Sequence, residues 1–317
     1  MTYDSIPVSP LGGEAPVRSV ADPLRQVTVQ VTRWRGAAAD VAVDELAVEE
    51  PLEVRASSSA SPTPETVAVI MRTPGLDDEL AAGFLYGEGL LTRREELVAI
   101  RPGLDNDGLP SPDILEVVTT ERADIARRAR EGGYSRQFAV TSGCGVCGKT
   151  TVEAACALLP PVSREGFAIA PETLYRLPDL LRERQRVFNA TGGLHAAALF
   201  DAEGRLLALR EDVGRHNAVD RLVGRALLDG ALPLAGRALM VSGRLSFEIV
   251  LKALAAGIPL VAAVSAPSSL AVDLARSGGV TLVGFVRGER LNVYTWPERV
   301  RSRSAAPSYG PGEAAAG

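Results

Sequence analysis

Residues 238–286, ALMVSGRLSFEIVLKALAAGIPLVAAVSAPSSLAVDLARSGGVTLVGFV, carry the strongest structural signal in this chain. Three short apolar runs alternate with two segments of helical periodicity, and Gly, Pro or Ser residues separate them. The pattern predicts strands at 238–241, 260–264 and 281–286, with helices at 247–256 and 270–277. Repetition of strand and helix builds right-handed parallel crossovers, so we expect a layered α/β domain.

Upstream of this stretch the same domain continues. Residues 196–200 and 206–210 flank Asp-Ala-Glu-Gly, a good hairpin turn, and a helix is expected over 217–228. Residues 171–185 also have helical character, and Pro178 predicts a break or kink within them.

A second, smaller α+β unit precedes it. Val27, Val29 and Val31 alternate with polar residues, which is typical of a half-buried strand. Further strands are expected at 52–55, 66–71 and 114–119, with a helix at 77–91, and a charged helix or loop at 124–131. The sequence therefore predicts a disordered leader at 1–25 and an N-terminal α+β domain at 26–137. A larger α/β domain with the cysteine loop is expected at 138–300, and a disordered tail at 301–317.

Composition excludes several classes of protein. A net charge of −5 leaves no electrostatic footprint for nucleic acid or an anionic membrane. No apolar run is long enough to cross a bilayer, and the first residues lack the pattern of a secretion signal. Three cysteines, two of them closely spaced, do not form a disulfide framework. We therefore expect a cytoplasmic protein with no nucleic-acid or membrane partner.

Two of the three cysteines lie in residues 141–149, TSGCGVCGK. The glycines around Cys144 and Cys147 permit φ > 0 and leave the sulfur atoms little shielded. Lys149 is close by, and positive charge lowers the pKa of a thiol toward the reactive thiolate. Residues 150–153, TTVE, have the form of a capping box, so the cysteines should precede a helix N-terminus, which also favours thiolates.

Sulfur chemistry, metal binding and an inert structural role are all open for this pair. A closed zinc site needs four N or S ligands, and the remaining candidates are Cys156, His195 and His216. A thioredoxin-like role is disfavoured because the motif does not follow the first strand of its domain. Cys156 falls on the apolar face of the expected helix and should lie in the core. Paired exposed thiols favour Cys144 and Cys147 as nucleophiles.

Two loops follow neighbouring parallel strands of the predicted sheet. Residues 241–244, VSGR, and 264–268, VSAPS, supply small residues and hydroxyls directly before helix N-termini, which bind anions readily. Arg244 adds a planar donor group that matches phosphate. Together the loops predict a phosphate-bearing ligand at the carboxyl edge of the sheet, with the candidate ligand residues Ser242, Gly243, Arg244 and Ser265.

Residues 285–290, FVRGER, leave the last strand and turn at Gly288. One interpretation is a simple hairpin to residues 291–294. The other is a guanine nucleotide site, in which Glu289 accepts from the N1 and N2 donors of the base. The candidate residues are Phe285, Val286, Arg287, Gly288, Glu289 and Arg290.

Two other polar segments have two readings each. Residues 210–217, REDVGRHN, are either a solvated loop with Asp212 or Asn217 as a helix cap, or the polar wall of a site. Residues 191–195, TGGLH, place two glycines before His195, which is either a proton donor or a satisfied half-buried histidine.

These motifs together resemble the formate dehydrogenase accessory sulfurtransferase family, FdhD. The resemblance covers nearly the whole expected folded region, and its specificity comes from the number and order of the motifs. They are EPLEVR at 50–55, MRTPG at 71–75, ELAAGFL at 79–85, TSGCGVCG at 141–148, TGGLH at 191–195, EDVGRHNAVD at 211–220, SGR at 242–244 and AVSAP at 263–267.

The resemblance implies a larger domain similar to the cytidine deaminase fold. It also implies a homodimer that takes persulfide sulfur from a cysteine desulfurase. The sulfur would pass to the molybdenum (or tungsten) bis(molybdopterin guanine dinucleotide) cofactor of formate dehydrogenase. On this basis Cys144 is the expected persulfide carrier and 285–290 the expected cofactor-binding segment. His195 is followed by two alanines, so the H-x-E of zinc deaminases is missing and deaminase activity is not expected.

The residues and the resemblance lead to one hypothesis, a sulfurtransferase in which Cys144 carries the sulfur. Cys147 then either displaces that sulfur as sulfide or relays the persulfide, and both routes stay open. We expect no resident metal. The alternatives are a zinc-binding structural protein and a chaperone that binds the cofactor without covalent sulfur.

Overall fold

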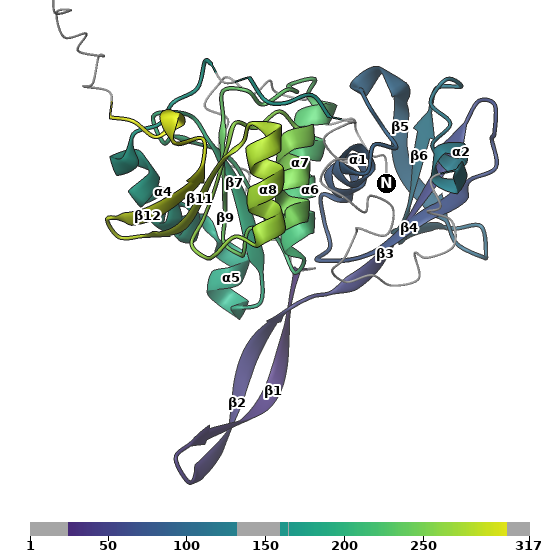
Figure 1. Ribbon diagram of the computed structural model, residues 1–317. Helices are drawn as coiled ribbons and strands as arrows, with labels where there is room; N and C mark the ends of the chain where they lie inside the picture. Colours follow the sequence, from purple (N-terminus) through teal and green to yellow (C-terminus); the bar gives the residue numbers. More distant parts are fainter. Residues whose placement is uncertain (1–24, 132–158, 164, 303–317) are drawn as a thin grey trace, which may run out of the picture.

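The computed structural model describes residues 25–131, 159–163 and 165–302 (Figure 1). The leader, the tail, the cysteine loop with its expected helix, and Cys156 lie outside these residues, so the predictions for them stay predictions. Within the described ranges, no helix is both long and apolar enough to span a membrane.

The larger domain is built on a six-stranded sheet with the order β12-β11-β10-β9-β7-β8. Its parallel part is β9 (Ala238–Val241), β10 (Leu260–Ala263) and β11 (Thr281–Arg287), connected through α7 (Phe247–Ala255) and α8 (Ser269–Gly278). The predicted alternation of strands and helices over 238–286 is therefore confirmed, and so is the mixed α/β fold class.

Antiparallel strands complete this sheet at both sides. The hairpin of β7 (His195–Phe200) and β8 (Leu206–Asp212) forms at the predicted turn, and β7 pairs antiparallel with β9. At the other side β12 (Arg290–Thr295) folds back on β11, which confirms the hairpin interpretation of the last strand. A short 3-10 helix follows at Pro297–Arg299.

Helices cover both faces of the sheet (Figure 1). On one face α6 (Arg215–Leu228), α7 and α8 pack over the odd-numbered apolar residues of β9 and β10. On the other face lies α4 (Pro171–Arg184), which continues through Pro178. The predicted break is wrong because the buried stripe of three leucines on α4 outweighs the cost of one proline. These are Leu174, Leu177 and Leu181.

The smaller domain has a four-stranded sheet with helices on one face. Its strand order is β4-β3-β6-β5, and the helices bury their apolar sides against the residues of β3 that point the same way. The sequence predicted these elements except β5 and the 3-10 turn, and it left open whether α2 is a helix or a loop. The strands are β3 (Glu50–Ser58), β4 (Glu65–Arg72), β5 (Leu97–Leu104) and β6 (Pro110–Thr119), and the helices are α1 (Asp77–Gly87), α2 (Ile125–Glu131) and a 3-10 turn at Arg94–Glu96.

The first two strands form a separate ribbon that projects from the molecule (Figure 1). β1 (Gln26–Arg35) pairs only with β2 (Ala38–Ala47) among the described strands, in one uninterrupted antiparallel register. The strand predicted at 27–32 is confirmed, and Val29 and Val31 are half-buried as expected, but Val27 is 47% exposed. Alternation alone cannot show whether a second layer exists to cover the apolar side.

The two domains meet where α1 crosses α6. A Cβ built on Gly83 would lie 1.8 Å from the carbonyl oxygen of Asp220, and one built on Gly224 would lie 1.8 Å from the carbonyl oxygen of Glu79. The helix backbones therefore touch, and only glycine fits at either position.

We expect Gly224→Ala to lower the free energy of unfolding by about 1–3 kcal/mol or more, because backbone atoms must move to admit the methyl group. Gly236→Ala is the matched control, since nothing lies within 4 Å of a Cβ at that position. Urea unfolding of both variants measures the difference. Equal midpoints would contradict the close helix contact.

Candidate functional site

Three of the predicted segments lie side by side at the carboxyl edge of the larger sheet. The loop after β9 and the loop after β10 are joined by backbone hydrogen bonds: Leu245 N donates to Ala266 O (3.2 Å), and Ser268 N donates to Leu245 O (3.0 Å). The end of β11 is joined to the second loop, since Phe285 N donates to Ser265 O (3.2 Å). Residues 242–244, 265 and 285 thus belong to one surface.

The loop after β9 also contacts the start of β7. Ala196 N donates to the hydroxyl oxygen of Ser242 (2.8 Å), and Ser242 N donates to Ala196 O (2.9 Å). A Cβ built on Gly243 would lie 3.5 Å from Nδ1 of His195 and 3.7 Å from Cδ of Arg215. His195 and Arg215 therefore border the same surface, on the side away from Phe285.

Unpaired cations gather around this edge. Arg244, Arg287 and Arg290 are exposed, and none of them makes a hydrogen bond or ion pair with another described residue. Arg215 is half-buried, and its Nε is shielded from solvent without a partner among the described residues. Guanidinium groups placed this way bind planar anions such as phosphate.

His195 is neutral at ordinary pH in this setting. Burial lowers the pKa of its imidazole, and the positive charge of Arg215 lowers that pKa further. An anion bound between the two side chains would raise the pKa again.

The two helix N-termini at this edge are capped by the protein itself. The hydroxyl of Ser246 accepts from Ile249 N (3.5 Å), and that of Ser268 accepts from Ala271 N (3.2 Å). These caps satisfy one amide donor of each helix. Anion binding at this edge therefore depends more on the arginines than on the helix termini predicted from the sequence.

Residues 210–217 divide between the candidate surface, which Arg215 borders, and a junction around Asp212 that neither sequence interpretation anticipated. Asp212 is fully buried, and its carboxylate accepts from Arg221 Nη2 (2.7 Å), Thr73 N (3.3 Å), Gly214 N (2.8 Å) and Asn217 Nδ2 (2.8 Å). Gly214 occupies the N-cap position of α6, so the prediction of Asp212 or Asn217 as the cap is wrong. The polar residues serve the domain junction, because a buried carboxylate needs such donors.

His216 lies behind the candidate surface. Its Nε2 is 2.8 Å from the Glu248 carboxylate and 3.1 Å from the Ser246 hydroxyl, so it links the first turns of α6 and α7. Both histidines were candidate zinc ligands from the sequence, yet of the two His195 is the one that borders Arg215 across Gly243.

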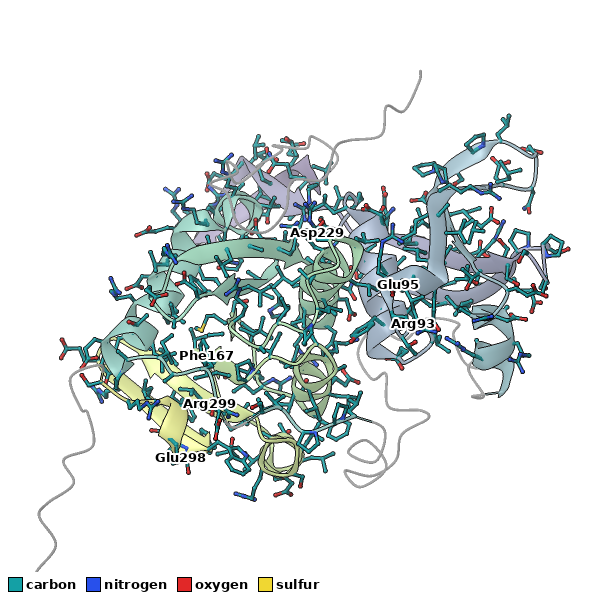
Figure 2. All side chains as sticks on the ribbon, turned by 90° about the horizontal axis from the view of Figure 1, so that it is seen from above. Arg93, Glu95, Phe167, Asp229, Glu298 and Arg299 are labelled. Atoms are coloured by element: carbon teal, nitrogen blue, oxygen red, sulfur yellow. The ribbon has the colours of Figure 1, made fainter. Side chains whose placement is uncertain are left out.

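The described chain stops and resumes on different domains around the cysteine segment. Before it, α2 packs into the core of the smaller domain. After it, Leu159 packs against the core of the larger domain, and Val162 N donates to Gly278 O (2.9 Å). Arg299, labelled in Figure 2, donates to Ser163 O (2.8 Å) and Gly279 O (2.8 Å) at the amino edge of the sheet. Cys144 and Cys147 lie outside the described residues.

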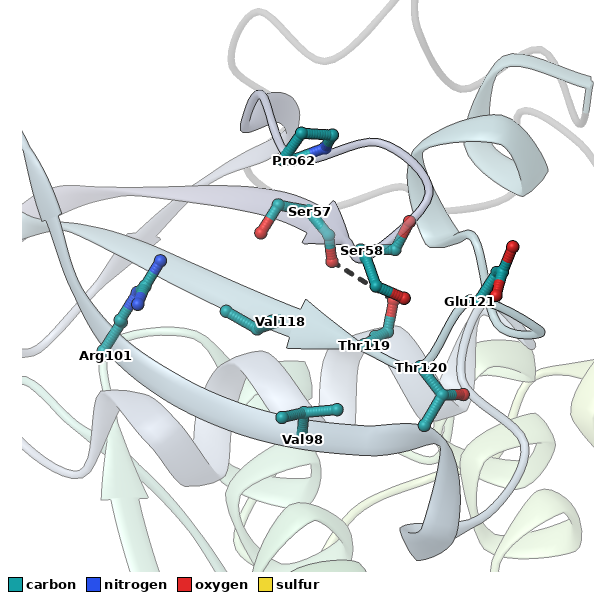
Figure 3. Close-up of a pocket in the computed structure, with 10 residues that line it drawn as sticks. Ser57, Ser58, Pro62, Val98, Arg101, Val118, Thr119, Thr120 and Glu121 are labelled. Carbon is teal, nitrogen blue, oxygen red and sulfur yellow. Dashed lines mark hydrogen bonds between the residues drawn. The ribbon is translucent and has the colours of Figure 1, made fainter.

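A separate hollow lies on the smaller domain (Figure 3). It has a volume of about 410 Å³ and is open to solvent, and hydroxyl groups of Ser57 and Thr119 line it. Both hydroxyls already bind within the protein, to the Glu116 carboxylate (2.6 Å) and to Ala123 O (2.6 Å). Arg101 also pairs with Glu116 (3.0 Å). The polar groups of this hollow are thus used in the sheet.

The chain matches the family model of the FdhD/NarQ family over residues 47–301. It belongs to the FdhD/NarQ family. It is 48% identical over 286 residues to the sulfur carrier protein FdhD of Streptomyces avermitilis, covering 87% of this chain and 96% of that protein. It is 42% identical to the protein of the same name from Saccharolobus solfataricus, over 81% of this chain and 91% of the other.

A solved structure agrees with this FdhD/NarQ assignment. The crystal structure of a candidate formate dehydrogenase accessory protein from Desulfotalea psychrophila matches with a TM-score of 0.66 and 25% sequence identity, covering 87% of this chain and 99% of that one. The resemblance found from the sequence motifs is confirmed.

We expect Asp212→Asn to lower the free energy of unfolding by about 3–5 kcal/mol, because it removes the nearer carboxylate of the buried Arg221 guanidinium (2.7 Å) and leaves only that of Asp77, at 3.7 Å. Arg244→Ala should change it by less than about 0.5 kcal/mol, since Arg244 is exposed and makes no described bond. Thermal and urea unfolding of the two variants show whether Asp212 stabilises the fold and whether Arg244 does not. A large loss for Arg244→Ala would contradict its assignment to a binding surface.

Proposed function

We propose that this protein is a sulfurtransferase that carries persulfide sulfur on Cys144 to the bis(molybdopterin guanine dinucleotide) cofactor of formate dehydrogenase. A role as a sulfur carrier is supported by the similarity of this chain to relatives called sulfur carrier proteins. The carboxyl edge of the sheet is the proposed docking surface for the cofactor. One observation carries this assignment. Backbone hydrogen bonds join three segments into one surface bordered by arginines that have no described partner, and the segments are 242–245, 265–268 and residue 285.

The loading step is a displacement at sulfur. The Cys144 thiolate attacks the outer sulfur of a cysteine desulfurase persulfide, the S–S bond of that persulfide breaks, and the desulfurase cysteine leaves as thiolate. Cys144 then holds the transferred sulfur as a persulfide. No electrons are gained or lost overall, because one persulfide replaces another.

The delivery step has two routes. In one, the Cys147 thiolate attacks the inner sulfur of the Cys144 persulfide, which forms a Cys144–Cys147 disulfide and releases hydrosulfide to the acceptor. A dithiol reductant must then restore the two thiols. In the other, Cys147 takes the outer sulfur itself and presents it, and no disulfide forms.

The cofactor enters this reaction as the acceptor substrate. Its diphosphate groups match Arg215 and Arg244, and the backbone of Gly243 permits close approach because no side chain intervenes. The Gly288–Glu289 turn between β11 and β12 extends beyond the last residues of β10, which supports the proposal that Glu289 accepts from a guanine edge. The desulfurase, the dehydrogenase and a second copy of the chain are the expected partners.

Two other roles remain as alternatives to covalent transfer. A structural zinc site would hold Cys144 and Cys147 as ligands, and purified protein would then contain zinc in a one-to-one ratio. A chaperone that binds the cofactor without covalent sulfur would show no added sulfur after treatment with a desulfurase and cysteine. Intact mass measurement together with a zinc assay distinguishes covalent sulfur transfer, a structural zinc site and a chaperone role.

We expect Cys144→Ala to abolish activation of formate dehydrogenase and to remove the added mass of one sulfur atom after desulfurase treatment. Cys156→Ala is the control and should keep most of the activity, with only the stability loss that goes with a smaller apolar side chain. Activation assays and intact mass spectra of both variants provide the measurement. Full activation by Cys144→Ala would exclude the persulfide mechanism.

GDP should bind this protein measurably and ADP more weakly, because adenine lacks the donors at N1 and N2 that Glu289 accepts. Losing one charge-assisted hydrogen bond costs about 1.5–3 kcal/mol, or roughly ten- to a hundred-fold in affinity. Glu289→Ala should therefore equalise the two ligands, while Arg287→Ala should weaken both.

Glu298→Ala serves as the matched control for this calorimetric test. Glu298 is also exposed, and it lies in the 3-10 helix after β12, away from the carboxyl edge (Figure 2). Equal affinity of the wild type for GDP and ADP would refute base reading by Glu289, and no nucleotide binding would remove the site.

A further inference from the structure

Gly243 is a glycine that the fold itself does not require. Gly224 lacks a side chain because a Cβ there would lie 1.8 Å from a backbone oxygen, and Gly288 adopts a left-handed φ of 54°. Gly243 has neither constraint. Its φ lies outside the left-handed region, and the described atoms nearest to a Cβ built there are 3.5 and 3.7 Å away, which is ordinary van der Waals contact. The described part of the chain would therefore accept a methyl group at this position.

Two polar side chains border the space that this methyl group would fill. The built Cβ lies 3.5 Å from Nδ1 and 3.7 Å from Cε1 of the His195 ring, and 3.7 Å from Cδ of Arg215. His195 begins β7, shortly after α5 (Arg186–Thr191), and Arg215 begins α6, so regular structure holds both residues. Among the described residues neither the imidazole nor Nε of Arg215 has a hydrogen-bond partner, although both side chains are half-buried. Half-buried donors of this kind favour a ligand that supplies acceptors.

We propose that the space beside Gly243 is a phosphate subsite, and that residue 243 is a glycine so that a phosphate oxygen can lie between His195 and Arg215. This inference rests on the docking surface proposed above and names the part of the ligand that binds at its β7 side. Arg215 supplies a positive charge and a planar set of donors, and His195 supplies one N–H donor.

The charge around this space favours phosphate over a carboxylate. Arg244, the residue after Gly243, is exposed and has no partner among the described residues, so a second guanidinium group is close. A terminal phosphate carries nearly twice the negative charge of a carboxylate and has three acceptor oxygens. Two arginines match that charge and that number of acceptors.

The subsite also fixes the direction of the ligand along the edge of the sheet. Gly243 follows β9, which pairs with β7, whereas the Gly288–Glu289 turn follows β11, two strands from β9. Neighbouring strands lie about 4.8 Å apart, so the two ends of the surface are separated by about 10 Å. With its phosphate beside Gly243, the nucleotide lies across the end of β10 and its base reaches the turn. Substitutions can therefore disable the phosphate end and the base end separately.

Gly243→Ala tests the subsite with a change that the fold accepts. The urea unfolding midpoint should stay that of the wild type, while the affinity for GDP should fall about ten-fold or more, because the methyl group displaces the phosphate from its donors. Gly236→Ala is the matched control, since a Cβ there meets nothing within 4 Å and the residue lies before β9, at the other end of that strand. It should change neither property. A lower unfolding midpoint for Gly243→Ala, or an unchanged affinity for GDP, would overturn the proposal.

Inorganic pyrophosphate tests the phosphate end alone. The chain contains two histidines, and the imidazole resonance that is missing from His195→Gln identifies His195 in the NMR spectrum. Pyrophosphate should shift this resonance in the wild type and in Glu289→Ala, where only the base end is changed, but not in Gly243→Ala. A wild-type resonance that does not move with pyrophosphate, or one that still moves in Gly243→Ala, would contradict the subsite.

Failure of the subsite and failure of the docking surface give different results. If GDP does not bind the wild type at all, the docking surface is absent and the subsite with it. If GDP binds the wild type and Gly243→Ala equally well, the docking surface stands and its phosphate end lies elsewhere.

Discussion

The structure depends on one buried ion pair, Arg221 with Asp212. Neither side chain is exposed to solvent. Arg221 donates to the Asp212 carboxylate and also to the carbonyl oxygens of Thr73 (2.6 Å), Leu76 (2.9 Å) and Gly75. A guanidinium group offers five donors in a fixed plane, and lysine could not reach all of these acceptors. The arginine thus holds the loop before α1 against the end of β8 and fixes the two domains to each other.

Beside this ion pair, the crossing of α1 and α6 also fixes the two domains to each other. α1 approaches α6 closely enough for backbone contact only because Gly83 and Gly224 lack side chains. Arg210 of β8 adds an ion pair with Glu79 of α1 (2.5 Å). On the far side, Lys252 of α7 pairs with Asp220 of α6 (2.7 Å), and both side chains are nearly buried. Burial disfavours the charged form of this lysine, but the Asp220 carboxylate outweighs that effect and raises its pKa. The junction is therefore built around several partnered charges.

At the carboxyl edge of the larger sheet the charges are exposed and have no described partner, unlike those of the junction. There Arg244, Arg287 and Arg290 point into solvent without a described partner, a few residues from strands that are wholly buried. Buried charges with full sets of partners stabilise one arrangement of the chain, whereas exposed unpaired charges are available to a ligand. The contrast separates the motifs of this family into two groups. Asp212, Asn217 and Arg221 hold the scaffold together, whereas Arg215 and residues 242–244 and 285–290 are left for binding.

The sequence alone predicted the sheet and its edge because strand periodicity and buried length are local properties. Residues 238–286 contain the whole βαβαβ pattern, and the loops after β9 and β10 had to meet once the strands were parallel. The junction was not predictable in this way. Thr73 and Asp212 are far apart in the chain, and nothing local shows that Arg221 will reach both. The same limit explains why the sequence left open whether residues 210–217 border a site, and why Val27 of β1 was expected to be half-buried.

The rigid junction also constrains how a cysteine between the domains can act. The described chain leaves the smaller domain at the end of α2 and re-enters the larger one at Leu159, and the ion pairs at the junction fix these two anchors relative to each other. The segment 132–158, which carries Cys144 and Cys147 in the sequence, therefore begins and ends on two points that do not move relative to each other. Any sulfur donor and acceptor for these cysteines, as proposed above, must accordingly meet them on one fixed scaffold and not through closure of one domain on the other.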